Sequence, residues 1–293
     1  MEKSKVYFCR DITKENLVKL YKKLGKELPG NVAVKVHSGE EGNQNYLRPE
    51  FMKDIIEYVN GTVVECNTAY SGERNTTEKH LKTISKHGWS TLYKFDLMDR
   101  DEPDLVLSVR NGVHLKENYV GKNMANYDSM LVLSHFKGHP MGGYGGALKQ
   151  LSIGCASSRG KAWIHSAGTN KDQYTLWDNL PEQNDFLESM AEAASSVVDY
   201  FKGNMVFINV MANMSVDCDC CSIAEDPCLK DIGILISLDP VAIDKACIDL
   251  VDNSLDPGRE HFMERVNSRN GIHTIDKAYE LGVGNIDYEL IEI

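Results

Sequence analysis

Short runs of β-branched and apolar residues alternate with amphipathic stretches along the first half of the chain. The apolar runs predict β-strands at 6–9, 32–36, 62–66, 105–109 and 129–134. Apolar residues at helical spacing predict α-helices at 13–25, 49–59 and 76–88. Thr13 can cap the first of these helices, and Gly25 can end it. This alternation predicts an α/β fold with right-handed crossovers between parallel strands.

The second half of the chain continues the alternation. It predicts a long helix at 184–201, strands at 205–210 and 231–236, and helices at 258–268 and 274–281. Asp239-Pro240 marks the start of a further helix, because the aspartate can accept backbone N–H groups and proline suits the first turn. We therefore expect largely parallel or mixed sheets flanked by helices, in two lobes with a cleft between them. The expected lobes are residues 1–125 and residues 126–293.

Charge and composition narrow the class of protein. The 293 residues include 32 lysines and arginines against 43 aspartates and glutamates, which gives a formal net charge of −11. Nucleic-acid-binding proteins normally show a basic surplus, so this balance argues against a nucleic-acid partner. The chain has no apolar run of about 18 residues and no signal-peptide pattern. We expect a cytoplasmic protein without membrane attachment, and the sequence leaves its oligomeric state open.

Cysteine usage points to metal chemistry. The chain has eight cysteines, and without a secretion signal they are expected to be reduced thiols. Four of them fall between residues 218 and 228, and thiolates are ligands for zinc and iron. The spacing does not contain the regular iron–sulfur run C-x₂-C-x₂-C-x₃-C, so a solvated acidic loop remains the alternative. The candidate metal ligands are Cys218, Cys220, Cys155, Cys228 and His165.

Polar loops follow three of the predicted strands, at 37–43, 67–74 and 135–149. In α/β proteins such loops converge over the carboxyl edge of the sheet, so we expect them to share one cleft. His37 begins the first loop. His135, Lys137 and His139 begin the last, where imidazoles near neutral pKa can act as general acids or bases. The candidate catalytic residues are therefore His135, His139, Lys137 and His37.

Glycines dominate the second part of the 135–149 loop. They can turn backbone N–H groups toward an anion, and the short helix expected next adds a partial positive charge. Close structural packing is the competing explanation for these glycines. The predicted anion-binding residues are Gly142, Gly143, Gly145, Gly146 and Lys149.

These motifs resemble a family described as domain of unknown function 362, DUF362, whose members are often labelled iron–sulfur centre proteins. The matching stretches are 34–40, 45–49, 135–149, 151–156, 164–168, 216–220, 231–234 and 238–244. The resemblance implies an iron–sulfur centre, although this sequence lacks the ferredoxin-like cysteine segment that many relatives carry. The family is also distantly similar to nickel-pincer lactate racemases, which are two-lobed α/β enzymes. By that analogy His135 and His139 are acid–base or cofactor-contacting groups.

The leading hypothesis is a metal-binding redox protein or enzyme that acts on an anionic small molecule. Its cofactor is expected to be an iron–sulfur cluster or a zinc or iron ion. The first alternative is a metal-free racemase or isomerase that transfers a proton beside a carboxylate through a histidine pair. The second is a non-catalytic electron-transfer or binding protein with a redox partner protein.

Overall fold

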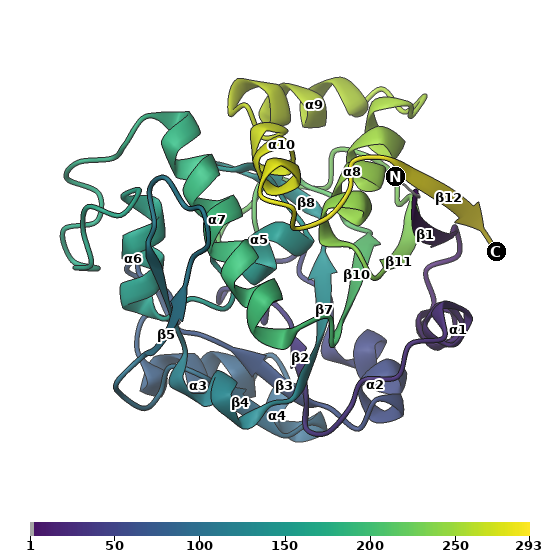
Figure 1. Ribbon diagram of the computed structural model, residues 1–293. Helices are drawn as coiled ribbons and strands as arrows, with labels where there is room; N and C mark the ends of the chain where they lie inside the picture. The colour runs from purple at the N-terminus through teal and green to yellow at the C-terminus, as the bar shows by residue number, and fades with distance from the viewer. Residues whose placement is uncertain (1–2) are drawn as a thin grey trace.

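An eight-stranded mixed sheet runs through the computed structural model, which describes residues 3–293 (Figure 1). Its strand order is β12-β1-β11-β10-β7-β2-β3-β4. The strands are β1 (Ser4–Cys9), β2 (Val32–Lys35), β3 (Thr62–Glu65), β4 (Phe95–Leu97), β7 (Ser129–His135), β10 (Met205–Met211), β11 (Gly233–Ser237) and β12 (Tyr288–Glu292). The five strands from β10 to β4 are parallel, β12 is parallel to β1, and β11 is antiparallel to both its neighbours. The predicted α/β fold with a mostly parallel mixed sheet is confirmed.

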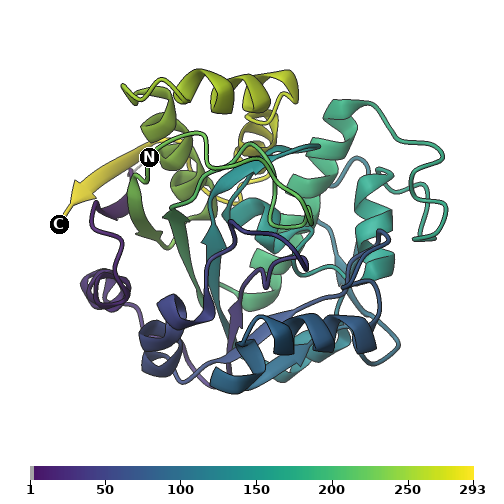
Figure 2. The ribbon, with the colours of Figure 1, turned by 180° about the vertical axis from the view of Figure 1, so that it is seen from behind.

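Helices cover both faces of the sheet (Figures 1 and 2). One face packs against α1 (Lys14–Leu24), α2 (Pro49–Tyr58), α3 (Thr77–Lys86) and α4 (Trp89–Leu92). The other packs against α5 (Ala147–Leu151), α7 (Gln183–Phe201), α8 (Pro240–Asp252), α9 (Arg259–Ser268) and α10 (His273–Glu280). Successive residues of β7 alternate between the two cores, because side chains along a strand point to opposite faces. The middle of the strand, residues 130–133, is therefore continuously apolar, as expected for a parallel strand buried on both faces.

Local capping explains several helix boundaries. The Thr13 side chain accepts a hydrogen bond from the backbone N–H of Asn16, and Gly25 ends α1 with a φ of 71°. Asp239 accepts from the N–H groups of Val241 and Ala242, and Pro240 occupies the first turn of α8. These caps agree with the sequence prediction.

Some elements differ from expectation. The strand predicted at 105–109 is β5 (Leu105–Ser108), but it pairs with β6 (Glu117–Val120) in a separate two-stranded ribbon. An apolar run indicates a strand without specifying its partner, which here comes from a later part of the chain. The sequence also did not indicate β12 or α6 (Ser158–His165). None of the helices in the described residues is both long enough and apolar enough to cross a bilayer.

The parallel strands determine where the polar loops lie. β3, β2, β7 and β10 are neighbours in the sheet and run in the same direction, so their carboxyl ends share one edge. Because β2 pairs with β7, strands from both sides of residue 125 belong to one sheet. The division into lobes at that residue stays a prediction.

Candidate functional site

A pocket of about 260 Å³ lies at this carboxyl edge. The ends of β2 and β3 contribute Lys35 and Glu65 to its lining. The chain after β7 contributes Lys137 and His139, and α6 contributes His165. The loops that the sequence predicted to share a cleft therefore meet around one cavity. His37 and Lys149 line the same pocket.

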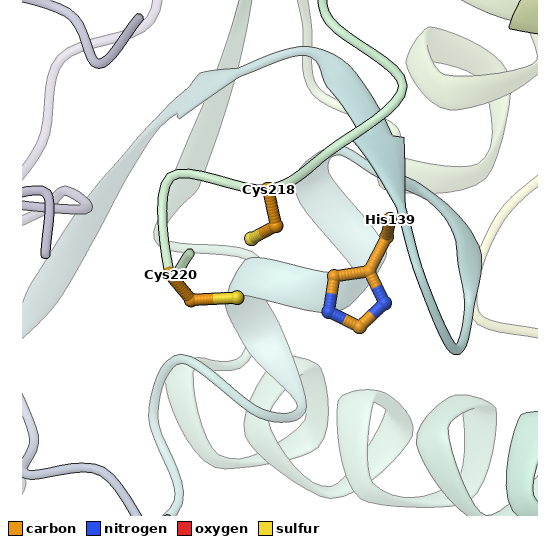
Figure 3. Close-up of side chains that lie close together, drawn as sticks. All are labelled: His139, Cys218 and Cys220. Atoms are coloured by element: carbon orange, nitrogen blue, oxygen red, sulfur yellow. The ribbon is translucent and has the colours of Figure 1, made fainter. Parts of the chain in front are cut away.

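Three potential metal ligands lie together at one side of the pocket, where His139 and Cys220 belong to its lining and Cys218 lies beside them (Figure 3). His139 ends β8 (Lys137–His139), which pairs with β9 (Gly143–Gly145), and Cys218 and Cys220 lie on the loop after β10. One ring nitrogen of His139 and the two sulfur atoms lie within 4.8 Å of one another. Figure 3 shows the imidazole and both thiols directed toward a common space. Two thiolates and one imidazole suit a zinc or iron ion with a further coordination position open.

The hydrogen bonds of two histidines fix how their rings face Cys218. His139 Nδ1 accepts from the backbone N–H groups of Met141 and Gly142, and His37 Nδ1 accepts from the N–H of Gly39. In the metal-free protein the ring proton of each therefore sits on Nε2. Burial lowers the pKa of both imidazoles to about 4, so both rings are neutral at pH 7.

Two ammonium groups stabilise the thiolate form of Cys218. Burial and the neighbouring Cys220 thiol act to raise the pKa of Cys218, Lys149 and Lys137 act to lower it, and the net shift of this pKa is downward. Lys149 Nζ lies 3.8 Å from Cys218 Sγ. Since metals bind thiolates rather than thiols, this electrostatic arrangement favours metal binding at neutral pH.

Asp219 anchors the cysteine loop to the end of β7. Its carboxylate accepts from His135 Nδ1 at 2.9 Å and pairs with Lys137 Nζ at 3.1 Å. Burial acts to raise the pKa of Asp219, but His135 and Lys137 hold it well below its usual range. His135 Nε2 faces the carbonyl oxygen of Ala212 at 2.5 Å, so both ring nitrogens are occupied. The structure thus separates the two predicted histidines: His139 lines the pocket, whereas His135 holds the loop that presents Cys218.

A buried ion-pair network that the sequence did not indicate lies beside the cysteine loop. Arg74 donates to the Tyr70 hydroxyl, which donates to the carbonyl oxygen of Cys220. Arg74 pairs with Glu40 at 3.2 Å and with Glu65 at 3.0 Å, and only 1% of its surface is exposed. Glu65 also accepts from His80 Nε2 at 3.1 Å. The sequence signals were the polar loops at 37–43 and 67–74, which contain Glu40 and Arg74, whereas Glu65 lies in the predicted strand at 62–66. The network fixes the ends of β2 and β3 relative to each other.

The family model for a domain of unknown function, DUF362, matches residues 32–249. This span includes every loop that lines the pocket and all three residues of the metal-ligand group. The chain belongs to the DUF362 family. A comparison with curated proteins gives no match.

Two solved structures are similar to this DUF362 protein. One is the lactate racemase apoprotein from Thermoanaerobacterium thermosaccharolyticum, with a TM-score of 0.42, 15% identity, and coverage of 70% of this chain and 50% of that chain. The other is a protein from Thermotoga maritima, with a TM-score of 0.43, 13% identity, and coverage of 91% and 58% respectively. This chain therefore spans less than two thirds of either solved chain.

The glycines of the DUF362 protein's 142–146 loop are explained largely by packing. A Cβ on Gly143 would lie 2.9 Å from Gly271 Cα, and one on Gly146 would lie 2.4 Å from Asp244 Oδ1. The N–H group of Gly142 is bonded to His139, and the N–H groups of Ala147 and Leu148 at the start of α5 are bonded to Asp244. Gly145, Gly146 and Lys149 line the pocket, and Lys149 supplies the charge that an anion needs. Anion binding by the five predicted residues stays a prediction.

The remaining predicted metal ligands lie outside the His139–Cys218–Cys220 group. Cys155 is fully buried, and burial raises the pKa of its thiol to about 11. Cys228 contacts the carbonyl oxygen of Met214 at 3.4 Å. His165 lines the pocket, stacks on Phe186, and its Nδ1 lies 2.7 Å from the carbonyl oxygen of Lys161.

A second group of potential ligands, around Glu188 and Glu192, lies away from the pocket and is already occupied. Glu192 accepts from three consecutive backbone N–H groups, at residues 113–115. Glu188 pairs with His114, His273 and Lys277. These carboxylates tie a loop and α10 to α7, which accounts for the group without a metal.

Proposed function

We propose that this DUF362 protein is a metal-dependent enzyme that acts on an anionic small molecule, with one zinc or iron ion bound by His139, Cys218 and Cys220. The observation that supports this proposal is that the three ligands lie together at a cationic pocket, which His139 and Cys220 line. Three protein ligands with an open position are typical of catalytic rather than structural sites. The bound ion supplies a Lewis acid that polarises an oxygen of the substrate.

The pocket lining favours an anionic substrate. It contains Lys35, Arg74, Lys137, Lys149 and Lys161 against one carboxylate, Glu65, in a chain whose net charge is −11. Positive charge concentrated in a low-dielectric cavity attracts anions, even though the net negative charge of the chain repels them elsewhere. Because Arg74 and Lys137 already have carboxylate partners, Lys35, Lys149 and Lys161 are the cationic groups of the lining without a carboxylate partner of their own.

Single substitutions of the three ligands are expected to abolish stoichiometric metal binding. The measurement is elemental analysis of anaerobically prepared protein after loading with zinc or ferrous iron and removal of the excess. We expect one ion per chain in the unmodified protein, and about a tenth of that or less in Cys218→Ser, Cys220→Ser and His139→Gln.

Cys228→Ser is the matched control, because Cys228 belongs to the same loop but not to the ligand group. It is expected to retain the ion. Equal metal content in Cys218→Ser and the unmodified protein contradicts the proposal.

A metal-free proton-transfer enzyme is the second candidate. The observation that favours it is the set of neutral imidazoles at the pocket, since burial lowers the pKa of His37, His139 and His165 to about 4. A neutral imidazole can accept a proton from a carbon beside a carboxylate. In this case histidine substitutions abolish turnover, whereas Cys218→Ser and Cys220→Ser leave it intact.

A further inference from the structure

Two buried lysines at the floor of the pocket have no acidic partner. Lys35 and Lys161 are 1% and 6% exposed. Lys35 Nζ donates to the carbonyl oxygen of Val36 and to Gln150 Oε1, and Lys161 Nζ donates to the carbonyl oxygen of Ala156. Within residues 3–293 neither ammonium group forms an ion pair, although buried charges in proteins are normally paired.

The carboxylates that act on these lysines do not fill this role. Asp99 interacts electrostatically with Lys161, but it forms no ion pair with that lysine, and both of its oxygens accept backbone N–H groups, from Asn67 and Ser158. Glu65 is close enough to act on the pKa of Lys35, yet burial outweighs it and lowers that pKa. Both oxygens of Glu65 are engaged, one by Arg74 and the other by His80. The charge of Lys35 and Lys161 is therefore left for a group that enters the pocket.

Gln150 provides an independent indication of a ligand. Its Oε1 accepts from Lys35 Nζ at 3.0 Å, so the orientation of the amide is fixed and its Nε2 must point elsewhere. Nε2 is buried without a hydrogen-bond partner, and the residue lines the pocket with 6% of its surface exposed. An unpaired buried donor costs about 1–3 kcal/mol, so a site that keeps one is suited to a ligand with an acceptor atom.

We propose that a carboxylate group of a small carboxylic acid binds between Lys35 Nζ, Lys161 Nζ and Gln150 Nε2. The inference deepens the proposed function and rests on it only for the statement that this acid is the substrate. The acid places its carboxylate at the floor of the pocket and its other end toward His139 and Cys220 on the wall. It must be small, because the cavity measures only about 260 Å³.

A carboxylate fits this floor better than a phosphate. Glu65 lines the same cavity, and its pKa is held well below the usual range because Arg74 and His80 offset its burial. A fixed negative charge repels a phosphate dianion more strongly than a carboxylate monoanion. The start of α5, which could otherwise bind phosphate, is capped by Asp244.

Calorimetric titration of the metal-loaded protein tests the site, with acetate, pyruvate, malonate and succinate as probes and inorganic phosphate as the competing anion. Gln150→Glu keeps the acceptor for Lys35, removes the unpaired donor and adds a negative charge, and Lys161→Met removes one ammonium group. We expect at least one carboxylate to bind more tightly than phosphate, and each substitution to weaken that binding about tenfold or more. Gln173→Glu makes the same charge change outside this pocket and should leave binding unchanged.

Thermal melts and metal content separate the possible failures. Replacing a buried, unpaired lysine by methionine is expected to preserve or raise the melting temperature, so Lys161→Met tests the site even if Gln150→Glu folds poorly. Loss of carboxylate binding with the metal retained supports the inference. Tighter binding of phosphate, no binding of any carboxylate, or binding unaffected by Lys161→Met overturns it. If the protein takes up no metal but still binds a carboxylate, the carboxylate site is supported and the proposed metal site is refuted.

Discussion

Replacing Arg74 with methionine is expected to lower the free energy of unfolding by about 3–5 kcal/mol. The substitution leaves the buried carboxylates of Glu40 and Glu65 without the guanidinium that pairs with both. Burial acts to raise the pKa of Glu65 and Arg74 acts to lower it, so without Arg74 the pKa of this carboxyl rises. The change is measured by urea unfolding at pH 7.

Arg110→Met is the matched control for Arg74→Met. Arg110 pairs with Asp199 at 2.7 Å, but its side chain is 75% exposed. Exposed ion pairs contribute about 0–1 kcal/mol, so this variant should remain close to the unmodified protein. Equal losses of unfolding free energy in the two variants contradict the stabilising role of the buried Arg74 ion pairs.

Lowering the pH from 7 to 5 is expected to cost the metal-free protein about 4 kcal/mol of stability through His139 and His165. Burial lowers the pKa of each from 6.5 to about 4. A histidine with a depressed folded-state pKa stabilises the fold above pH 6.5, and this contribution is lost as the pH falls toward 4. Each residue accounts for about 2 kcal/mol over this interval.

The pH effect is measured as the difference between the unmodified protein and the His139→Gln/His165→Gln variant. Asp244 acts in the opposite direction, because burial raises its pKa to about 6 and its protonated form favours the fold at low pH. Its contribution is present in both proteins and cancels. The double variant should lose about 4 kcal/mol less than the unmodified protein between pH 7 and pH 5. A double variant with the same pH dependence of stability as the unmodified protein contradicts this expectation.

The sequence predicted the positions of the loops around the pocket because strand patterns are local. The apolar runs before His37 and His135 identify strands, and parallel strands end at a common edge. The Cys218–Cys220 spacing was likewise visible as two thiols on one side of an extended segment. These features depend on residues that are close together in the chain.

The partners of the side chains could not be predicted in the same way. Asp219 accepts a hydrogen bond from His135, which lies 84 positions earlier in the chain, and this bond holds the His135 ring outside the pocket. Asp244 caps a helix that begins 97 positions earlier, at Ala147, which leaves fewer backbone N–H groups for an anion. Nothing in the sequence pointed to Gln150, because whether a side-chain donor is unpaired depends on the groups that the fold places around it.

X-ray absorption at the metal edge of the loaded protein tests directly whether His139, Cys218 and Cys220 bind the ion. We expect two sulfur ligands at about 2.3 Å and one nitrogen ligand at about 2.0–2.1 Å, together with one exchangeable light atom. In Cys220→Ser one sulfur should disappear, whereas Cys228→Ser should leave the spectrum unchanged. A shell of oxygen and nitrogen atoms without sulfur, or a spectrum that Cys220→Ser does not alter, contradicts the account.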